Sequence, residues 1–262
     1  MRVQQGFPFF IPLILFGSVF ISFPQSLTPE ARAATKTSPP VKVDLSPTPT
    51  PSPTPKVGFF KNVAMDQKTI WLSPFHIKRE DVKWLAPLAL TTAGLIATDR
   101  KSSAWVDRNG SLPKASRDVS LTGSVYATGG VVAGFYLIGH ATHNRRAQET
   151  GALAAEALFD TAIVTEVLKF ATERMRPNDG SGRGLFFKHG SSFPSGHSSS
   201  SWAVATVIAY KYKDQPLIKY GAFALAAAIG LSRYSGRNHF LSDVVVGSAI
   251  GFGIGRFVIA HH

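Results

Sequence analysis

One short polar turn carries residues that could handle a phosphate group. The turn Pro194-Ser195-Gly196-His197 runs into an alanine-containing, helix-like segment that begins at Ser198. Proline and glycine break regular structure, so a helix is expected to start here. A helix start presents unpaired backbone N–H groups and a partial positive charge, and both favour an anion. His197 could then exchange a proton with that anion, and an N-cap loop with an incidental surface histidine is the alternative.

A second cluster supplies two cations. Lys169 and Arg176 are spaced by two helical turns, so both lie on one side if the helix continues that far. Pro177 disfavours helix at the residue before it. An arginine binds phosphate oxygens with a planar fork and a lysine binds them as a point charge. Taken alone, the cluster could be a solvated helix end in which Glu173 pairs with Lys169.

A third cluster runs from Ser232 to Asp243 and contains Arg233 and His239. His239 and Asp243 are four residues apart, so on a helix the carboxylate can accept a hydrogen bond from one ring nitrogen. That bond would fix the tautomer and leave the other nitrogen free to attack. A buried structural His–Asp pair is the alternative.

Together the three clusters contain an oriented nucleophile, a proton donor, three cationic side chains and a helix start. These are the parts needed to cleave a phosphate ester through a covalent intermediate. No metal is required by this set of groups.

The full pattern is Lys169-x6-Arg176-Pro177, Pro194-Ser195-Gly196-His197 and Ser232-Arg233-x5-His239-x3-Asp243. It resembles the complete three-part signature of the type 2 phosphatidic acid phosphatase (PAP2) superfamily. That superfamily also includes bacterial class A acid phosphatases and vanadium haloperoxidases. Every signature position is filled, in order, and the resemblance covers roughly residues 82–260.

The resemblance implies a role for each residue. His239 attacks phosphorus to form a phosphohistidine and is oriented by Asp243. His197 protonates the leaving alcohol and then activates water. A bound phosphate should raise the pKa of both histidines, which favours the protonated His197 needed as an acid. The residues expected to bind the phosphate are Lys169, Arg176, Arg233, Ser195 and the backbone N–H of Gly196.

The elements that must position these clusters are helices, because strand alternation is largely missing and alanine-rich runs are separated by Gly, Pro and charged residues. We predict an all-α protein, a compact bundle of about six core helices. In an antiparallel bundle the end of the third helix, the start of the fourth, the end of the fifth and the start of the sixth share one face. The six predicted helices are Val82–Thr98, Val119–His140, Gly151–Phe170, Ser198–Lys211, Leu217–Leu231 and Leu241–Ala260.

The chain divides into four predicted regions. Residues 1–33 are typical of an export signal, with an uncleaved anchor helix as the alternative. Residues 34–55 are rich in Pro, Ser and Thr and predict an extended, disordered linker. Residues 56–81 are an accessory segment that packs on the domain or lies at a lipid interface. Residues 82–262 are the predicted phosphatase domain.

The amino-acid composition restricts the chemical classes of partner that are expected. A formal net charge of +12 and a pI near 10.1 favour anionic partners. Nucleic acid is not expected, because no arginine-rich helix, aromatic-studded sheet or zinc-ligand spacing is present. Cysteine is absent, which excludes disulfides, thiol nucleophiles and cysteine-ligated metals. The expected partners are a phosphorylated lipid or small phosphate ester and an anionic membrane surface.

These patterns predict a metal-independent phosphatase on the extracytoplasmic side, soluble or membrane-associated. It would hydrolyse phosphate monoesters, either lipid phosphates or related pyrophosphates. An integral membrane enzyme whose active site faces outward is the alternative location, although several predicted helices carry charges that make them poor spans. No cofactor is expected, and vanadate should inhibit. The alternative functions are a haloperoxidase with vanadate as cofactor and a non-catalytic protein that binds anionic lipid.

Overall fold

The computed structural model describes residues 58–79, 81–108, 124–179 and 182–262, all within one unit that spans Pro53–His262. The predicted signal and linker, residues 1–33 and 34–55, lie outside the described residues. Within the described residues the secondary structure is helical and contains no strand, which confirms the predicted all-α class. The elements are α1 (Phe59–Leu72), η1 (Ser73–His76), α2 (Val82–Arg108), α4 (Val125–Ala141), α5 (Arg145–Thr172), α6 (Gly196–Lys211), α7 (Pro216–Ser235) and α8 (Leu241–His261).

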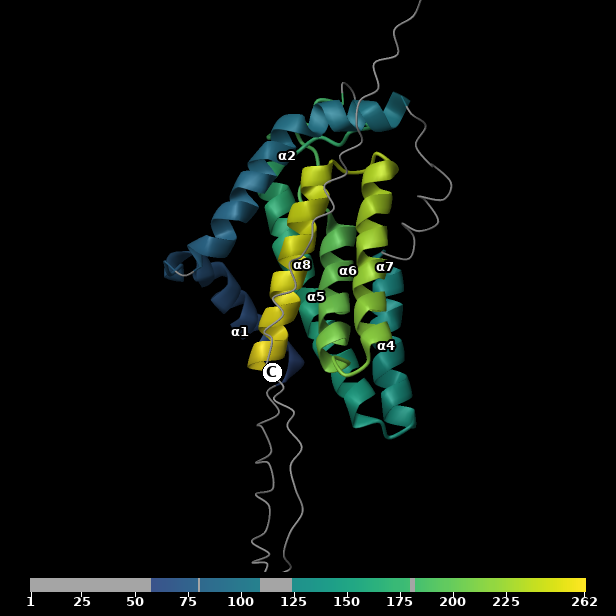
Figure 1. Cartoon of the computed structure of the whole chain (residues 1–262). Helices are drawn as coiled ribbons and strands as arrows, with labels where there is room; N and C mark the ends of the chain where they lie inside the picture. The colour runs from purple at the N-terminus through teal and green to yellow at the C-terminus, as the bar shows by residue number, and fades with distance from the viewer. Residues whose placement is uncertain (1–57, 80, 109–123, 180–181) are drawn as a thin grey trace, which may run out of the picture. The chain divides into compact units, whose positions relative to one another are not determined.

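Helix α6 forms the centre of the bundle, with α5, α7 and α8 around it (Figure 1). The side chains from Ala203 to Ala209 are all buried, and the neighbouring helices add apolar side chains to the same core. Four consecutive serines, Ser198–Ser201, are also buried in the first turns of α6. Small side chains near its N-terminus let neighbouring helices approach that end closely.

A stripe of three glycines brings α8 against α6. A methyl group at Gly247 would lie 2.6 Å from the Ser195 carbonyl oxygen, and one at Gly251 would lie 2.0 Å from the Ser199 oxygen. One at Gly255 would lie 2.8 Å from the Ala203 oxygen. Any side chain at these positions would push the helices apart, because these are backbone contacts. The stripe therefore sets the register that places the N-terminus of α8 beside that of α6.

The helix ends differ from the predicted ones in several places. Helix α5 begins six residues before the predicted Gly151, because the side chain of Asn144 caps it by accepting a hydrogen bond from the Ala147 backbone N–H (3.1 Å). Helix α2 continues past the predicted end at Thr98 to Arg108. The first five residues of the predicted helix Val119–His140 lie outside the described residues, and α4 begins at Val125.

The accessory segment contains a helix that packs on the domain. The rings of Phe59 in α1 and Phe159 in α5 meet edge to face, with centroids 5.3 Å apart. Gln67 of α1 also donates a hydrogen bond to the Asp160 carboxylate (2.8 Å). Helix α1 therefore contacts α5 through both apolar and polar side chains.

Large apolar side chains are exposed on the outer faces of several helices. Among the described helices, one is long and apolar enough to cross a membrane by length and composition, the 21-residue α8 with a mean hydropathy of 1.6. A third of that stretch is buried inside the bundle (33%). Exposed examples from α4, α5 and α7 are Tyr126, Leu137, Ile138, Phe159, Phe170, Leu217, Tyr220 and Leu231.

Candidate active site

The N-terminus of α6 forms one wall of the site. Ser195 is its N-cap residue and Gly196 its first residue. A methyl group at Gly196 would lie 3.2 Å from Lys169 Nζ, so the ammonium group of α5 stands directly over this helix start. The hydroxyl oxygen of Ser195 is buried and has no hydrogen-bond partner among the described residues. A helix start, an ammonium group and an unsatisfied hydroxyl therefore converge where an anion would be stabilised.

His197 lies within electrostatic reach of the other predicted site residues. Burial lowers the pKa of His197 most, and the charges of Arg233, His239, Lys169 and Arg176 add to it in that order of effect, which together bring the pKa from 6.5 to about 4. All four groups must be close for this to occur, although they come from two separate parts of the chain. The ring is therefore neutral at pH 7 while no anion is present.

The ring of His239 is held by a carbonyl oxygen. His239 is 2% exposed, and its Nδ1 lies 2.7 Å from the backbone carbonyl oxygen of Ser192. A carbonyl only accepts, so in the neutral ring the proton is on Nδ1 and Nε2 is left with its lone pair. Nε2 is thus the nitrogen able to act as a nucleophile. Burial is the main cause that lowers the pKa of His239, and Asp243 opposes it.

The predicted hydrogen bond between His239 and Asp243 is replaced by a longer contact. Asp243 Oδ2 lies 3.7 Å from His239 Nδ1, as an ion-pair neighbour rather than a hydrogen-bond acceptor. The prediction assumed that both residues lie on one helix, but α8 begins at Leu241, after His239. The side chain of Asp243 instead caps α8 by accepting a hydrogen bond from the Phe240 backbone N–H (2.8 Å).

Asp243 is connected to the histidine through Ser192. The Ser192 hydroxyl donates a hydrogen bond to Asp243 Oδ2 (2.5 Å), while the carbonyl of the same residue accepts from His239. In addition, the backbone N–H of Ser195 donates to the Asp243 carbonyl oxygen (3.0 Å). The turn that carries His197 is therefore fixed to the first turn of α8.

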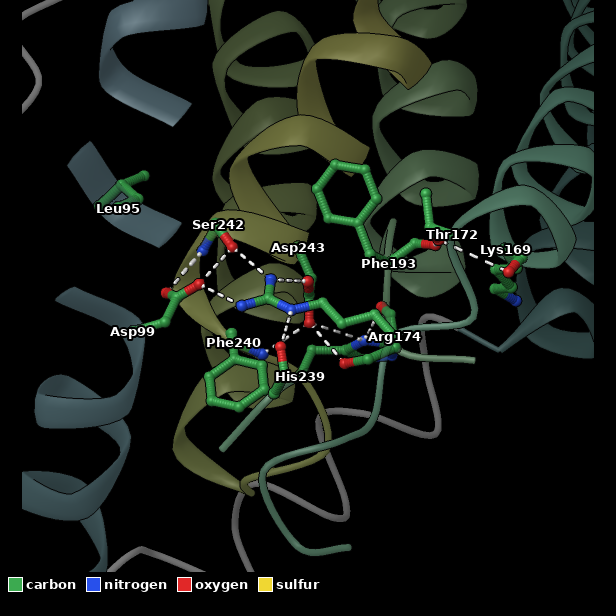
Figure 2. A network of polar contacts seen from close by, with 12 residues as sticks. Leu95, Asp99, Lys169, Thr172, Arg174, Phe193, His239, Phe240, Ser242 and Asp243 are labelled. Atoms are coloured by element: carbon green, nitrogen blue, oxygen red, sulfur yellow. Dashed lines mark hydrogen bonds and ion pairs between the residues drawn. The ribbon is translucent and has the colours of Figure 1, made fainter. Parts of the chain in front are cut away.

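A buried arginine lies behind this arrangement (Figure 2). Arg174 is 1% exposed, and its guanidinium donates to Asp243 Oδ1 (2.6 Å) and to Asp99 Oδ2 (2.8 Å). The same guanidinium stacks on the ring of Phe240, with 4.4 Å to the ring centroid. Asp99, from α2, also accepts hydrogen bonds from the backbone N–H (3.2 Å) and the hydroxyl of Ser242. Two carboxylates and one guanidinium thus lock α2, α5 and α8 around His239.

Three residues of this network were not predicted from the sequence: Asp99, Arg174 and Ser192. Arg174 lies inside the x6 gap of the first cluster, and Ser192 lies just before the second. A signal was present for Arg174, since a third cation in a segment that ends at Pro177 needs a partner. Asp99 had no local signal, because it is separated from Arg174 by 75 residues.

The chain leaves the helix before Arg176, so Lys169 and Arg176 do not lie on one side of a continuous helix. Helix α5 ends at Thr172, and Glu173 adopts a left-handed conformation (φ 43°). The backbone N–H groups of Met175 and Ser192 then bond to Leu185 and Arg174, respectively, which holds residues 174–176 in an extended loop. A side chain at Gly190 would collide with the Arg174 carbonyl oxygen, at 2.1 Å.

The three cations reach the site from one loop and two helix ends. Arg176 donates a hydrogen bond to the Ser191 hydroxyl (3.3 Å), beside the turn that leads to His197. Arg233 lies in the last turn of α7, where burial and the charge of Arg176 lower its pKa to about 10. Lys169 pairs with Glu166 (2.6 Å), not with the predicted Glu173, whose carboxylate faces His189.

All eight predicted site residues therefore gather at one end of the bundle. The site thus contains two imidazoles, three cations and a helix N-terminus. Such a site could bind a tetrahedral phosphate dianion and transfer its phosphoryl group to His239. A pocket of about 320 Å³ opens beside them and is lined in part by Lys169, Phe170 and Ser191.

Residues 150–262 match the family model described as the PAP2 superfamily. This part of the chain is therefore similar to the PAP2 superfamily. The match contains every predicted site residue and also Arg174 and Ser192, whereas Asp99 lies before it. The predicted resemblance to this superfamily is confirmed over these residues.

Curated relatives agree with this assignment. The chain is 30% identical over 146 residues to a PA-phosphatase related-family protein of Dictyostelium discoideum, which covers 49% of this chain and 53% of the relative. It is 32% identical over 89 residues to the lipid A 1-phosphatase of Porphyromonas gingivalis, covering 34% of this chain and 18% of that protein. The chain thus spans about half the length of the first relative and less than a fifth of the second.

Two solved structures align with this chain. A transmembrane PAP2-type phosphatidylglycerolphosphate phosphatase from Bacillus subtilis aligns with a TM-score of 0.55 and 23% identity, over 67% of this chain and 94% of that one. Aquifex aeolicus LpxE aligns with a TM-score of 0.46 and 24% identity, over 57% and 86% of the two chains. The first alignment agrees with the helical bundle described above.

Proposed function

We propose that this chain is a phosphatase that hydrolyses phosphate monoesters through a phosphohistidine on His239. The observation that carries the proposal is the electrostatic environment of His197. Burial and four neighbouring basic side chains lower its pKa to about 4, and the cations among them give the site an excess of positive charge. A phosphate dianion would neutralise that excess, and the match of residues 150–262 to the PAP2 superfamily supports the same chemistry.

In the first step, Nε2 of His239 attacks phosphorus while the bond to the leaving oxygen breaks. His197 donates its proton to that oxygen, and the alcohol departs. In the second step, His197 accepts a proton from water as the water oxygen attacks phosphorus. The P–N bond breaks, inorganic phosphate is released and His239 regains its lone pair. Lys169, Arg176, Arg233 and the start of α6 stabilise the negative charge throughout.

The proton on His197 arrives with the substrate. The free site keeps His197 neutral, because burial and nearby cations lower its pKa. A bound dianion opposes the effect of those cations and raises the pKa of the ring. A phosphate monoanion can also carry the proton into the site and leave it on His197. His197 is therefore protonated, and able to act as the general acid, only when substrate is bound.

We propose a lipid phosphate or related pyrophosphate as the substrate class. The lipid A 1-phosphatase of P. gingivalis, which is similar over 89 residues, is consistent with this class. Exposed apolar side chains such as Phe170 and Leu231 are close in sequence to the site residues Lys169 and Arg233. These side chains could contact acyl chains while the cations bind the headgroup phosphate.

The proposed location is extracytoplasmic, in contact with an anionic membrane surface. The exposed apolar side chains of α4 and α7 and the net charge of +12 are suited to such a surface. An integral protein whose active face points outward is the alternative. Carbonate extraction of membranes distinguishes the two, since it releases a peripheral protein and retains an integral one.

The test is phosphate release by the purified chain from an aryl phosphate and from a panel of lipid phosphates, with and without detergent. We expect release from the lipid substrates and inhibition by vanadate, which mimics the transition state. No release from any substrate would contradict the proposal. Halide oxidation that appears only after vanadate is added would instead indicate a haloperoxidase.

A further inference from the structure

A second group of ionisable side chains lies elsewhere in the bundle, where α1, α5 and α8 meet. Asp66 comes from α1, Glu156 and Asp160 from α5, and His262 follows α8. Each of the three carboxylates is at least nine-tenths buried, with exposures of 4%, 4% and 0%. Asp160 and Lys169 are nine residues apart on α5, which corresponds to about 14 Å along the helix axis. The group is therefore separate from the active site.

Carboxylate oxygens surround one imidazole nitrogen. His262 Nε2 lies 3.1 Å from each oxygen of Asp66 and 3.3 Å from Glu156 Oε1. One ligand atom from each of Asp66, Glu156 and His262 lies within 4.8 Å of the other two. Nitrogen and oxygen ligands of a tetrahedral ion, with bonds of about 2.0–2.2 Å, are separated by roughly 3.3–3.6 Å. The observed spacing is close to that of ligands around a single ion.

The group contains more negative charge than its partners can balance. Asp160 Oδ2 is fully buried and has no hydrogen-bond partner among the described residues, and Glu156 Oε1 also lacks a hydrogen bond. Gln67 donates to the other oxygen of Asp160 (2.8 Å), so one lone acceptor is left facing Asp66. Three buried carboxylates face a single imidazole, and buried charges are stable only when they are paired or bind a metal.

We propose that Asp66, Glu156 and His262 bind one divalent transition-metal ion, with Asp160 as a neighbouring acceptor for a ligand water. An imidazole among the ligands favours Zn²⁺ over Mg²⁺ and Ca²⁺, which prefer all-oxygen sites. The ion links α1 and the end of α8 to the middle of α5. Its role is structural, because these ligands are distant from His239 and His197.

The test uses the full chain after dialysis against a chelator, followed by equilibrium dialysis with Zn²⁺ and metal analysis. We expect one Zn²⁺ per chain and at least tenfold weaker binding in His262→Gln. His261→Gln is the matched control, because His261 is the adjacent histidine and contacts Phe257 instead. Zn²⁺ should also raise the melting temperature of the wild type, by roughly 5 °C, and not that of His262→Gln.

A second variant separates loss of the site from loss of the fold. Glu156→Gln keeps the shape of the side chain, and Glu149→Gln on the same helix is its control because Glu149 pairs with Lys211 at the surface. We expect helical circular dichroism in both variants and weaker Zn²⁺ binding only in Glu156→Gln. Absence of saturable binding by the wild type would overturn the proposal. Equal loss in His261→Gln, or full binding by His262→Gln, would overturn it as well.

Discussion

The two ionisable clusters of this bundle are opposite in charge. In the active site, His197 and His239 are surrounded by cations, and burial together with those cations lowers their pKa values. In the second cluster, burial is the main cause that raises the pKa of Glu156 to about 7 and that of Asp160 to about 6, and the Asp66 carboxylate adds to it. In each cluster, burial and neighbouring like charges therefore disfavour the charged form of the histidines or of the carboxylates. The first is therefore suited to an anion and the second to a cation.

The two clusters also differ in how they are held. The active site is fixed by close backbone contacts between α6 and α8 and by the buried pairs of Arg174. The second cluster is formed by side chains alone, at the junction of α1 with α5 and α8. Catalysis that depends on orientation requires a rigid site, because a small displacement of the nucleophile lowers the rate by a large factor. The proposed structural ion would instead make the junction of α1 with α5 and α8 more rigid.

The largest effect is expected from removing the nucleophile. His239→Ala should reduce phosphate release from an aryl phosphate by at least about 1000-fold, because it removes the nitrogen that forms the covalent intermediate. Circular dichroism should show the helical content unchanged. His140→Ala is the control, since His140 is an exposed histidine of α4. Release at the wild-type rate by His239→Ala would refute the assigned nucleophile.

The next effect is expected from the arginine behind the nucleophile. Arg174→Lys keeps the charge but cannot donate to Asp99 and Asp243 at once, so Asp243 and the Ser192 contact to His239 should lose their alignment. We expect kcat to fall by about 10- to 100-fold while KM changes by less than about threefold. Arg146→Lys is the control, because Arg146 pairs with Asp214 away from the site.

A lower kcat with a nearly unchanged KM distinguishes a positioning role of Arg174 from a role in folding. A purely structural role for Arg174 would lower the amount of folded protein and leave the kcat of the folded fraction intact. If kcat per folded molecule is unchanged in Arg174→Lys, the positioning role is wrong.

The residues changed in these two variants differ in this respect: His239 was predicted from the sequence and Arg174 was not. The three clusters predicted the two histidines and three cations, because their spacing carries the chemistry directly. The helical class followed from composition, and the start of α6 from its Pro-Ser-Gly turn. The extended loop after α5 could not be predicted, since it depends on a left-handed Glu173 and on backbone bonds to residues 185–192. Asp99 was missed because only the packing of α2 brings it to Arg174.

A smaller effect is expected in the pH dependence of anion binding. Sulfate remains a dianion between pH 5 and 8, so changes in its affinity report the protein. A bound dianion raises the pKa of His197 from its depressed value of about 4, and linkage then requires tighter binding as the pH falls. We expect sulfate to bind about tenfold more tightly at pH 5 than at pH 7.5, as measured by calorimetry.

His197→Gln should weaken that pH dependence, because it removes a titrating group while keeping the cations. His140→Gln is the control, since His140 is an exposed histidine of α4. Identical pH dependence in the wild type and in His197→Gln would show that His197 does not take up the proton.

The smallest effect on activity is expected from a chelator. Removal of metal should lower the melting temperature by a few degrees, through loss of the ion that links α1, α5 and α8. Phosphate release at 25 °C should be unchanged, because none of the proposed catalytic steps uses a metal. A large loss of activity with EDTA at a temperature where the protein stays folded would place a metal in the reaction.

The most direct measurement of the central claim is to trap the covalent intermediate. Wild-type protein is mixed with a radiolabelled phosphate ester, quenched in alkali within milliseconds, digested and mapped by mass spectrometry. We predict an alkali-stable, acid-labile phosphoryl group on His239, absent in His239→Ala and accumulating in His197→Gln, where the second step is slowed. Turnover of the ester with no phosphoryl group on His239, or with the label on another residue, would contradict this account.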